Sequence, residues 1–317
     1  MAIHSVRWND PMPAVCRGGA LTIGNFDGVH RGHQALLGEL QRQARAAGGP
    51  AVAMTFNPPP VQLLRPEAMP AALTTLADRT RLMQAHGAEE VVVMQTTHEL
   101  LRHSAQQFFE AVVLRGFDAK VVVPGFNFAF GHNREGTVER LLAMCQAAGR
   151  RCVPVPPLTV GGQPVSSSRI RAELLDGNVA AAAELLGRPY RVQGTVTTGQ
   201  RRGQALGFPT ANLEGVQTLV PANGVYAARV SRAEGTWAGA ANIGPNPTFG
   251  EQVRKIEVHL IDFQGDLYGA WLSMDFIERL RETRKFAGPA ELVQQLQADI
   301  AAARRLVHDG PQRPMSR

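Results

Sequence analysis

The chain has 317 residues, a length that fits about two domains of ordinary size, each with its own hydrophobic core. Hydrophobic residues make up 44% of it and charged residues 19%, which excludes a disordered or fibrous protein. The formal net charge of +6 favours an anionic partner. Because the basic residues are scattered and only three Trp and three Tyr are available for base stacking, we expect a small phosphorylated ligand rather than nucleic acid.

The cysteines indicate the cellular compartment. Cys16, Cys145 and Cys152 are odd in number and form no C-x-x-C pair, which argues against a disulfide framework or a zinc site and for a reducing environment. The N-terminus lacks the apolar stretch of a signal peptide. The longest apolar runs, such as Val91–Met94, are far shorter than the ~20 residues that span a bilayer. We therefore expect a cytoplasmic protein with no membrane partner.

The first half of the chain alternates strand and helix patterns, which predicts a Rossmann-like open parallel α/β sheet. Ligands bind such sheets at the carboxyl ends of the strands. The predicted strands are Ala20–Ile23, Ala51–Phe56, Val91–Met94, Ala119–Val123 and Cys152–Val155. The predicted helices are a stripe through Leu36, Leu37, Leu40 and Ala44, then Asp78–Ala85, Ala105–Val113, Val138–Ala148, Arg169–Leu175 and Val179–Leu186.

Beyond Pro189 the pattern changes to closely spaced strands with Gly and Pro between them, which predicts a small antiparallel β-barrel. Its predicted strands are Tyr190–Val196, Gly224–Val230, Ala238–Ile243, Lys255–Phe263 and Trp271–Phe276. A helix is expected from Pro289 to about Val307, followed by a polar tail that we expect to be disordered. The predicted organisation is thus a first domain over 1–186, a second over 187–307 and a tail over 308–317.

A glycine-bracketed turn joins the first predicted strand to the first predicted helix, in the string "LTIGNFDGVHRGHQALL". Backbone N–H groups and the positive end of a helix converge there, which suits a phosphate group. Gly24 and Gly28 permit the tight turn and a close backbone approach. His30 and His33 lie one helical turn apart and can both donate hydrogen bonds to phosphate oxygens. The alternative to phosphate binding is that the glycines serve only the turn and that the histidines are ordinary residues of the first helical turn.

Two further stretches of the first domain are candidate phosphate-binding segments. In "FNFAFGHNREG", Gly131 and Gly136 would allow a loop to follow a phosphate, with Arg134 as a cation. The spacing also resembles a P-loop, but the essential lysine is missing and we reject that interpretation. In "VSSSRIR", over Val165–Arg171, three hydroxyls and two guanidinium groups stand at a helix start. From these residues alone, serine capping of the helix is the favoured interpretation, and it is compatible with phosphate binding.

The second domain contains a candidate metal site and a candidate base. Thr210 and Asn212 in "PTAN" are two residues apart, so on an extended segment both side chains face the same way. Their oxygens are plausible ligands for Mg²⁺, although a polar turn is the alternative. Glu257 stands in "KIEVHLIDF", which alternates apolar and polar residues as a half-buried strand does. It is either a solvent-facing residue or a carboxylate that accepts a proton from a hydroxyl nucleophile.

These strings together resemble one protein family. "GNFDGVHRGH" is similar to the H-x-G-H signature of nucleotidyltransferases, and in full it resembles the FAD synthetase module of bacterial bifunctional riboflavin kinase/FAD synthetases (FMN adenylyltransferases). "FNFAFGHNREG" and "VSSSRIR" are similar to the nucleotide-binding segments of that family. "GQALGFPTANL", "GVYAARV", "ANIGPNPTF", "KIEVHLIDF", "DLYG" and "LRETRKF" resemble its riboflavin kinase module almost to the C-terminal helix.

The resemblance implies an enzyme with two activities. The barrel would phosphorylate riboflavin with ATP, with Glu257 as general base and Mg²⁺ near Thr210 and Asn212. The α/β domain would transfer AMP from a second ATP to FMN, releasing pyrophosphate, with His30 and His33 stabilising the transferred group. The residues that the resemblance places against ATP or flavin are Gly24, Asn25, Phe26, Asp27, Gly28, Gly32, Asn57, Asn127, Gly131, Arg134, Ser166, Ser167, Ser168, Arg171, Gly207, Pro209, Thr210, Asn212 and Arg281.

The chain departs from the family pattern at two places in the first domain. Where the family commonly has Phe-Glu-Pro-His-Pro, this chain has "FNPPP" over Phe56–Pro60. Where the family has Asp-Phe-Arg-Phe-Gly, this chain has Asn127 and Ala129 in place of the Asp and the Arg. Three alternatives stay open. They are a monofunctional riboflavin kinase whose altered first domain binds ATP poorly, a nucleotidyltransferase for another acceptor such as a pantetheine or sugar phosphate, and a basic RNA-binding protein that uses the barrel as its platform.

Overall fold

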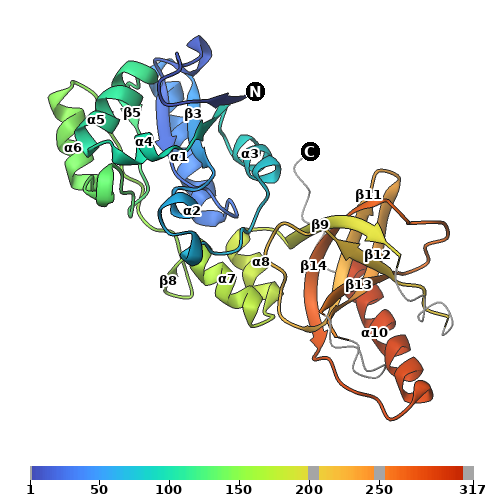
Figure 1. Ribbon diagram of the computed structural model, residues 1–317. Helices are drawn as coiled ribbons and strands as arrows, with labels where there is room; N and C mark the ends of the chain where they lie inside the picture. The colour runs from blue at the N-terminus through green and yellow to red at the C-terminus, as the bar shows by residue number, and fades with distance from the viewer. Residues whose placement is uncertain (1, 199–206, 246–253, 310–317) are drawn as a thin grey trace. The chain divides into compact units, whose positions relative to one another are not determined.

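The computed structural model describes residues 2–198, 207–245 and 254–309 (Figure 1). Contacts within the chain divide it into two compact units, Met1–Val165 and Ser166–Arg317, here called the first and the second unit. Helices α7 (Ser167–Leu175) and α8 (Val179–Leu186) belong to the second unit by their contacts. The functional boundary that the sequence predicts near residue 187 stays a prediction. The predicted tail begins at His308, which still belongs to a helix, and residues 310–317 lie outside the described part.

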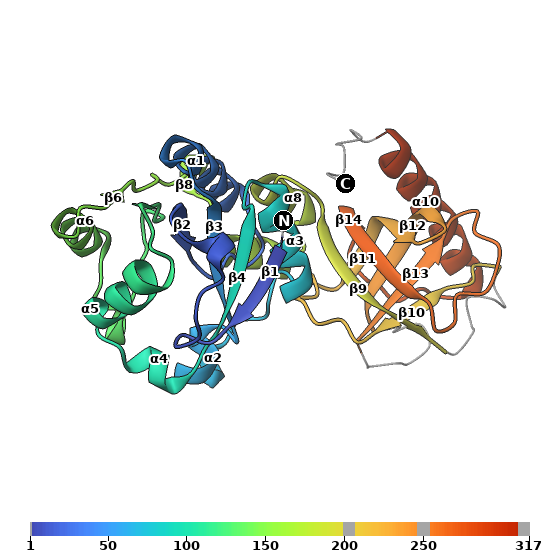
Figure 2. The same cartoon turned by 90° about the horizontal axis from the view of Figure 1, so that it is seen from above.

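The first unit is built on a six-stranded parallel sheet in the order β1-β4-β3-β2-β5-β6, and Figure 2 shows β1, β4 and β3 next to one another. The predicted α/β class is confirmed. The edge strand β1 was missed because its sequence, AIHSV, is mostly exposed and has no apolar run. The strands are β1 (Ala2–Val6), β2 (Ala20–Ile23), β3 (Ala51–Asn57), β4 (Glu90–Gln95), β5 (Val121–Val122) and β6 (Arg151–Cys152).

Helices cover both faces of this sheet. Residues along a strand alternate between the faces, so each inner strand contributes apolar side chains to two cores. Ala20 of β2 faces a core that includes Leu37 and Leu40 of α1, and burying each leucine is worth about 1.5–3 kcal/mol. Leu21 and Ile23 face the opposite core. The first face carries α1 (Arg31–Ala47) and α3 (Leu76–Ala85), and the second carries α4 (His98–Arg102), α5 (Ala105–Phe108), the π-helical segment η3 (Phe109–Gly116) and α6 (Val138–Ala147).

The strand order places a switch point beside β2. From β2 the chain passes to β3 and then β4 on one side, and afterwards crosses back to β5 on the other side. The loops that follow β2 and β5 therefore leave the same edge of the sheet. In open α/β sheets this is the place where ligands bind. Short elements connect the rest of this unit: η1 (Ala14–Cys16), α2 (Pro60–Leu64), η2 (Pro66–Ala68), η4 (His132–Arg134), β7 (Thr159–Val160) and β8 (Gln163–Pro164).

The second unit contains a closed antiparallel barrel in the order β10-β13-β12-β11-β14-β9, as predicted. Ala303 and Val307 of helix α10 (Pro289–Asp309) pack against the outside of the barrel (Figure 1). The sequence missed β10 because it is four residues long and contains a polar Asn. The strands are β9 (Tyr190–Thr197), β10 (Ala211–Glu214), β11 (Gly224–Arg232), β12 (Gly235–Gly244), β13 (Lys255–Leu260) and β14 (Trp271–Arg281).

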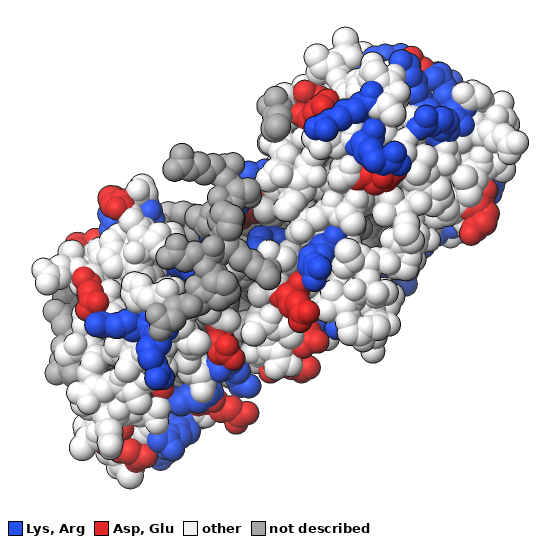
Figure 3. Space-filling view, turned by 180° about the vertical axis from the view of Figure 1, so that it is seen from behind, with Lys and Arg blue, Asp and Glu red and all other residues white. Residues whose placement is uncertain are grey.

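Charge is distributed in small groups over the face drawn in Figure 3, where Asp and Glu lie among the Lys and Arg side chains. This agrees with the scattered basic residues of the sequence. Across the described ranges, the structure contains no helix with both the length and the apolar character needed to pass through a lipid bilayer.

Candidate active sites

The β2–α1 loop has an unusual backbone. Phe26 and Val29 have φ angles of 50° and 38°, and Gly28 has a φ of 81°. A β-branched residue at positive φ is a genuine outlier. Phe26 and Val29 are 1% and 0% exposed, so their packing into the core holds the loop in this conformation. A Cβ at Gly24 would lie only 3.3 Å from the Phe26 ring, which explains the glycine there. Such over-determined strain is typical of ligand-binding loops.

Asp27, a predicted nucleotide-binding residue, holds this loop against the segment that precedes α3. Its carboxylate accepts hydrogen bonds from the N–H groups of Leu73 at 3.0 Å and Thr74 at 3.2 Å. The Thr74 hydroxyl donates to it at 3.2 Å, and Arg79 forms an ion pair with it at 3.7 Å. These contacts give Asp27 a structural role, while its role toward a nucleotide stays a prediction.

Asp27→Ala is expected to destabilise the first unit by about 1–3 kcal/mol, because two buried N–H groups lose their acceptor. The chain has three tryptophans, at positions 8, 237 and 271, so the double variant Trp237→Phe/Trp271→Phe leaves Trp8 as a reporter of the first unit. Urea unfolding followed by Trp8 fluorescence measures the change. Glu67→Ala, which removes an exposed carboxylate in the same unit, is the control. Equal stability of both variants would contradict the anchoring role.

His30 and His33 form a stacked pair at the start of α1. The Nδ1 atom of His30 accepts a hydrogen bond from the backbone N–H of His33 at 3.3 Å, which caps the helix. The two ring centroids are 3.7 Å apart with an interplanar angle of 15°. A Cβ at Gly32 would lie 3.2 Å from the His30 ring, so glycine leaves room for the stack. Because Nδ1 of His30 is an acceptor, this neutral ring carries its proton on Nε2.

The surroundings of His33 keep its ring uncharged. Burial, the neighbouring His30 and the Arg79 guanidinium together lower the pKa of His33 well below its usual value. Its Nδ1 atom is buried and has no hydrogen-bond partner in the described part of the chain. A neutral imidazole donates one hydrogen bond instead of two. The pair can therefore contact phosphate oxygens as dipolar donors rather than as cations.

The other predicted residues of the first unit lie on the loops that leave the same edge of the sheet. Asn57 ends β3, the neighbour of β2 on one side, and is exposed. Asn127 follows β5, the neighbour on the other side, and is also exposed. Asn25 is exposed in the β2–α1 loop between them. Parallel strands thus bring all three amides to the carboxyl edge of the sheet.

The segment after β5 is a tight loop fixed to the α4–α5 junction. Phe130 and Gly136 exchange two backbone hydrogen bonds, of 3.0 and 2.9 Å. A Cβ at Gly131 would lie 2.5 Å from the backbone nitrogen of Ala105, so only glycine fits there. The N–H of Ala105 also donates to the Glu135 carboxylate at 2.6 Å. Arg134 extends from this fixed loop as an exposed cation, with a φ of 60°.

The serine-rich segment lies in the second unit. The Ser166 hydroxyl accepts a hydrogen bond from the backbone N–H of Arg169 at 3.2 Å and caps α7, as the capping interpretation predicts. Ser167, Ser168 and Arg171 follow in the first turns of this helix. Their contact with ATP phosphates stays a prediction.

In the barrel, the strand register places four polar residues in one row. Asn212 of β10 lies opposite both Thr197 of β9 and Glu257 of β13. Glu257 in turn lies opposite Asn242 of β12. Directly opposed residues have Cβ atoms about 4.5–5.5 Å apart, so these side chains are neighbours. The intervening residues of β13, such as Val258, are buried, which leaves the row on the outer, half-exposed face.

Sequence reasoning missed two members of this row. Thr197 carries no local signal, and its buried hydroxyl has no hydrogen-bond partner within the ranges that the structure describes. Asn242 belongs to the string "ANIG", which resembles the kinase family but did not single out this residue. Both positions depend on the pairing of distant strands, which no local pattern reveals.

The "PTAN" segment only partly has the expected geometry. Asn212 is on β10, but Thr210 and Pro209 precede that strand and are exposed. The Pro209 carbonyl accepts a hydrogen bond from the His259 ring at 2.8 Å, which ties the segment to β13. Gly207, before it, has a φ of 84°. The neighbouring ranges 199–206 and 246–253, which include the beginning of "GQALGFPTANL" and the end of "ANIGPNPTF", lie outside the described residues.

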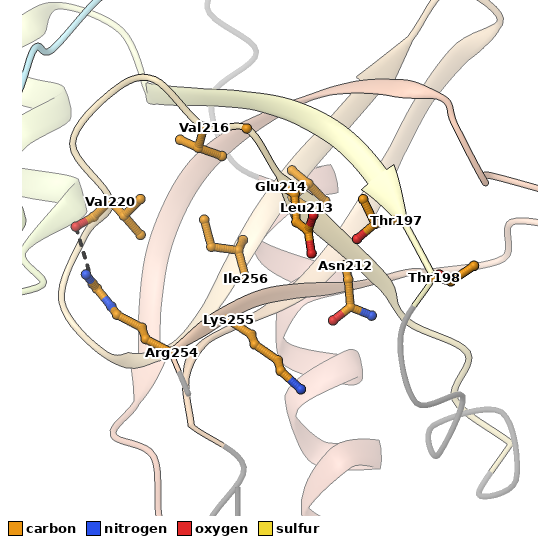
Figure 4. Close-up of a pocket in the computed structure, with 11 residues that line it drawn as sticks. Thr197, Thr198, Asn212, Leu213, Glu214, Val216, Val220, Arg254, Lys255 and Ile256 are labelled. Carbon is orange, nitrogen blue, oxygen red and sulfur yellow. Dashed lines mark hydrogen bonds between the residues drawn. The ribbon is translucent and has the colours of Figure 1, made fainter. Parts of the chain in front are cut away.

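A cavity of about 460 Å³ adjoins the polar row (Figure 4). Thr197, Asn212 and Glu214 line it from β9 and β10, and Arg254 and Lys255 line it from β13 and the residue before it. Its other walls include Leu213, Val216, Val220 and Ile256. This size and this mixture of apolar walls with a few polar groups suit a small organic ligand.

Arg281, predicted to contact flavin, lies at the end of β14 in an ion pair. Its guanidinium donates to the buried carboxylate of Asp299 on α10 at 2.7 Å and lies 5.5 Å from the Phe286 ring centroid. The contact fixes α10 to the barrel, and the flavin role stays a prediction.

Comparison with known proteins identifies the family of each part of the chain. A family model for FAD synthetase matches residues 13–169, and one for riboflavin kinase matches residues 186–307. A bifunctional riboflavin kinase/FMN adenylyltransferase from Pseudomonas fluorescens is 38% identical over 92% of this chain and 93% of its own length. The protein of that name from Escherichia coli K12 is 36% identical over 90% of this chain and 92% of its own.

A solved structure is also similar over most of the chain. It is a Streptococcus pneumoniae protein described as a macrolide-efflux protein, 32% identical, with a TM-score of 0.84 over 95% of this chain and 98% of its own. The FAD synthetase and riboflavin kinase domains are thus both present, in the order that the sequence predicts. The chain belongs to the bifunctional riboflavin kinase/FMN adenylyltransferase family.

Proposed function

We propose that this chain makes FMN from riboflavin and FAD from FMN, using ATP in both steps. The observation that carries the proposal is the pairing of Glu257 with Asn212, which lines a cavity, in a barrel matched by the riboflavin kinase model. The β2–α1 loop of the other domain, here called the histidine loop because it leads into His30 and His33, lies at the switch point of the sheet and supplies the second site. The boundary between the two activities is proposed near residue 187, where the second family model begins.

In the kinase step, Glu257 accepts the proton of the riboflavin ribityl hydroxyl as that oxygen attacks the γ-phosphate of ATP. A carboxylate within hydrogen-bond reach orients a weak nucleophile and removes its proton. The Thr210 hydroxyl and the Asn212 amide carbonyl are hard oxygen donors, which fit Mg²⁺ together with phosphate oxygens. Mg²⁺ held there would offset the negative charge on the transferred phosphoryl group. The products are FMN and ADP.

In the adenylyl step, the FMN phosphate attacks the α-phosphate of ATP and pyrophosphate leaves. No covalent enzyme intermediate is needed, because positioning and charge stabilisation suffice for this class of transfer. His30 and His33 donate hydrogen bonds to the phosphate oxygens from the N-terminus of α1, where the helix dipole also favours negative charge. Arg134 supplies a full positive charge from the loop after β5.

The residues Asn57 and Asn127 favour one alternative, a monofunctional riboflavin kinase whose altered first domain binds ATP poorly. Both amides stand at the carboxyl edge of the sheet and lack the charge that the family carries there. We also propose that the protein acts in the cytoplasm on small molecules and binds no nucleic acid. The free thiols of Cys16, Cys145 and Cys152 support a reducing compartment.

One assay tests both steps. Purified protein incubated with riboflavin, ATP and Mg²⁺ is expected to produce FMN and then FAD, separated by chromatography. Chelation of the metal should stop FMN formation, and added Mg²⁺ should restore it, because no side chain of the polar row carries the positive charge that Mg²⁺ supplies. FMN without FAD, with FMN and ATP in excess, would establish the kinase-only alternative. Release of pyrophosphate with a different phosphorylated acceptor would establish another nucleotidyltransferase.

A further inference from the structure

Three side chains of different ligand type converge at the edge of the parallel sheet, away from the candidate active site. They are His4 on β1, Cys16 in η1 and Glu90, the first residue of β4, and their ligand atoms all lie within 4.8 Å of one another. Among the residues that the structure describes, no other three His, Cys, Asp or Glu side chains converge in this way. Here they are called the β1 edge cluster.

The strand register creates this cluster. β1 pairs with β4 in parallel with Ala2 opposite Glu90, so His4, two residues further along, faces the same side of the sheet. The Nε2 atom of His4 and a carboxylate oxygen of Glu90 are 2.7 Å apart. Cys16 approaches from the η1 turn. Glu90 stands at the amino end of β4, whereas the histidine loop leaves the carboxyl end of β2, so the two places lie at opposite edges of the sheet.

The three groups differ in how far they are buried. Cys16 is 1% exposed, while the side chains of Glu90 and His4 are 16% and 20% exposed. Burial and the facing Glu90 carboxylate raise the pKa of the Cys16 thiol to about 11, so the sulfur is protonated near neutral pH. The partly exposed imidazole leaves a path from solvent.

We propose that His4, Cys16 and Glu90 bind one Zn²⁺ ion. One sulfur, one nitrogen and one oxygen donor suit Zn²⁺, whereas Mg²⁺ and Ca²⁺ prefer sets of oxygens. Zinc bonds of about 2.0–2.3 Å separate tetrahedral donors by roughly 3.3–3.8 Å, so the observed atoms need only small side-chain movements. A water molecule from the exposed side fills the fourth position.

Binding changes the protonation of two ligands. The Cys16 thiol releases its proton to solvent as the sulfur–zinc bond forms. The His4 ring takes the tautomer with its proton on Nδ1, which frees the Nε2 lone pair for the metal. The hydrogen bond between His4 and Glu90 is replaced by two bonds to zinc. The ion would tie the edge strand β1 and the η1 turn to β4. His4 precedes the residues matched by the FAD synthetase model, so part of this site lies outside the family match.

Cobalt titration tests this site. The full chain, reduced and freed of metal, is titrated with Co²⁺, a spectroscopic substitute for Zn²⁺. We expect one Co²⁺ per chain with a sulfur-to-metal charge-transfer band and tetrahedral d–d bands, all removed by Zn²⁺. Cys16→Ser should abolish the charge-transfer band, and His4→Ala should weaken binding at least about tenfold. Zn²⁺ should also raise the melting temperature of the wild type but not of His4→Ala.

Matched controls remove one residue of the same type elsewhere in the first unit: Cys152→Ser and His98→Ala should bind Co²⁺ as the wild type does. Glu90→Gln is a further ligand variant if Cys16→Ser fails to fold, as judged by circular dichroism. Absence of the charge-transfer band in the wild type would overturn the proposal. So would a band that persists in Cys16→Ser or disappears in Cys152→Ser.

Discussion

Glu257→Gln is expected to abolish FMN formation while the conversion of supplied FMN to FAD continues. The amide keeps the size of the side chain and one hydrogen-bond acceptor, but it cannot take the proton of the attacking hydroxyl. Loss of a general base costs about 10²–10⁴-fold in rate. Rates of FMN formation from riboflavin and of FAD formation from FMN, both measured by chromatography, separate the two steps.

Glu278→Gln is the matched control for this variant. Glu278 is an exposed carboxylate on β14 of the same barrel, so its loss should leave both rates unchanged. If Glu257→Gln stops both steps, the model with two independent sites is wrong. If it stops neither, the proton of the hydroxyl leaves by another route and Glu257 is only a polar residue of the row.

His33→Ala is expected to have the opposite effect, a loss of FAD formation with an intact kinase. Removal of one hydrogen-bond donor to a developing negative charge costs about 10²–10³-fold in rate. The substitution also removes the ring that stacks on His30, whose centroid lies 3.7 Å from that of His33. The loop therefore loses a packing contact as well as a hydrogen-bond donor. The rate of FAD formation from saturating FMN and ATP measures the effect, and FMN formation from riboflavin reports that the second domain is folded.

His33→Asn distinguishes a lost donor from a lost support, because it restores an N–H group without the ring. Partial recovery of the FAD rate would assign the effect to hydrogen bonding. His98→Ala, at an exposed position of α4, is the control and should retain full activity. An unchanged FAD rate in His33→Ala would remove His33 from the mechanism.

Much of the fold could be predicted because the relevant signals are local. The strand Ala20–Ile23 and the helix Val179–Leu186 have the predicted bounds, since an apolar run before a glycine turn and an alanine-rich stretch before Gly187 define them. The strands β1 and β10 were missed because neither has an uninterrupted apolar run. Such strands form because a neighbour offers hydrogen bonds, and that neighbour is distant in the sequence.

The candidate sites divide in the same way. The sequence by itself determined the two-part organisation, the histidine loop and the "PTAN" and "KIEVHL" strings, because these depend on residue types at short spacing. Only the tertiary structure decided that Asn212 faces Glu257, that the Asp27 carboxylate anchors its own loop, and that the His33 ring is uncharged. It also brought together the β1 edge cluster, which the spacing of the cysteines had argued against. Strand pairing brings together residues about a hundred positions apart, such as Ala20 and Val121, and neither strand register nor burial is set by neighbours in the chain.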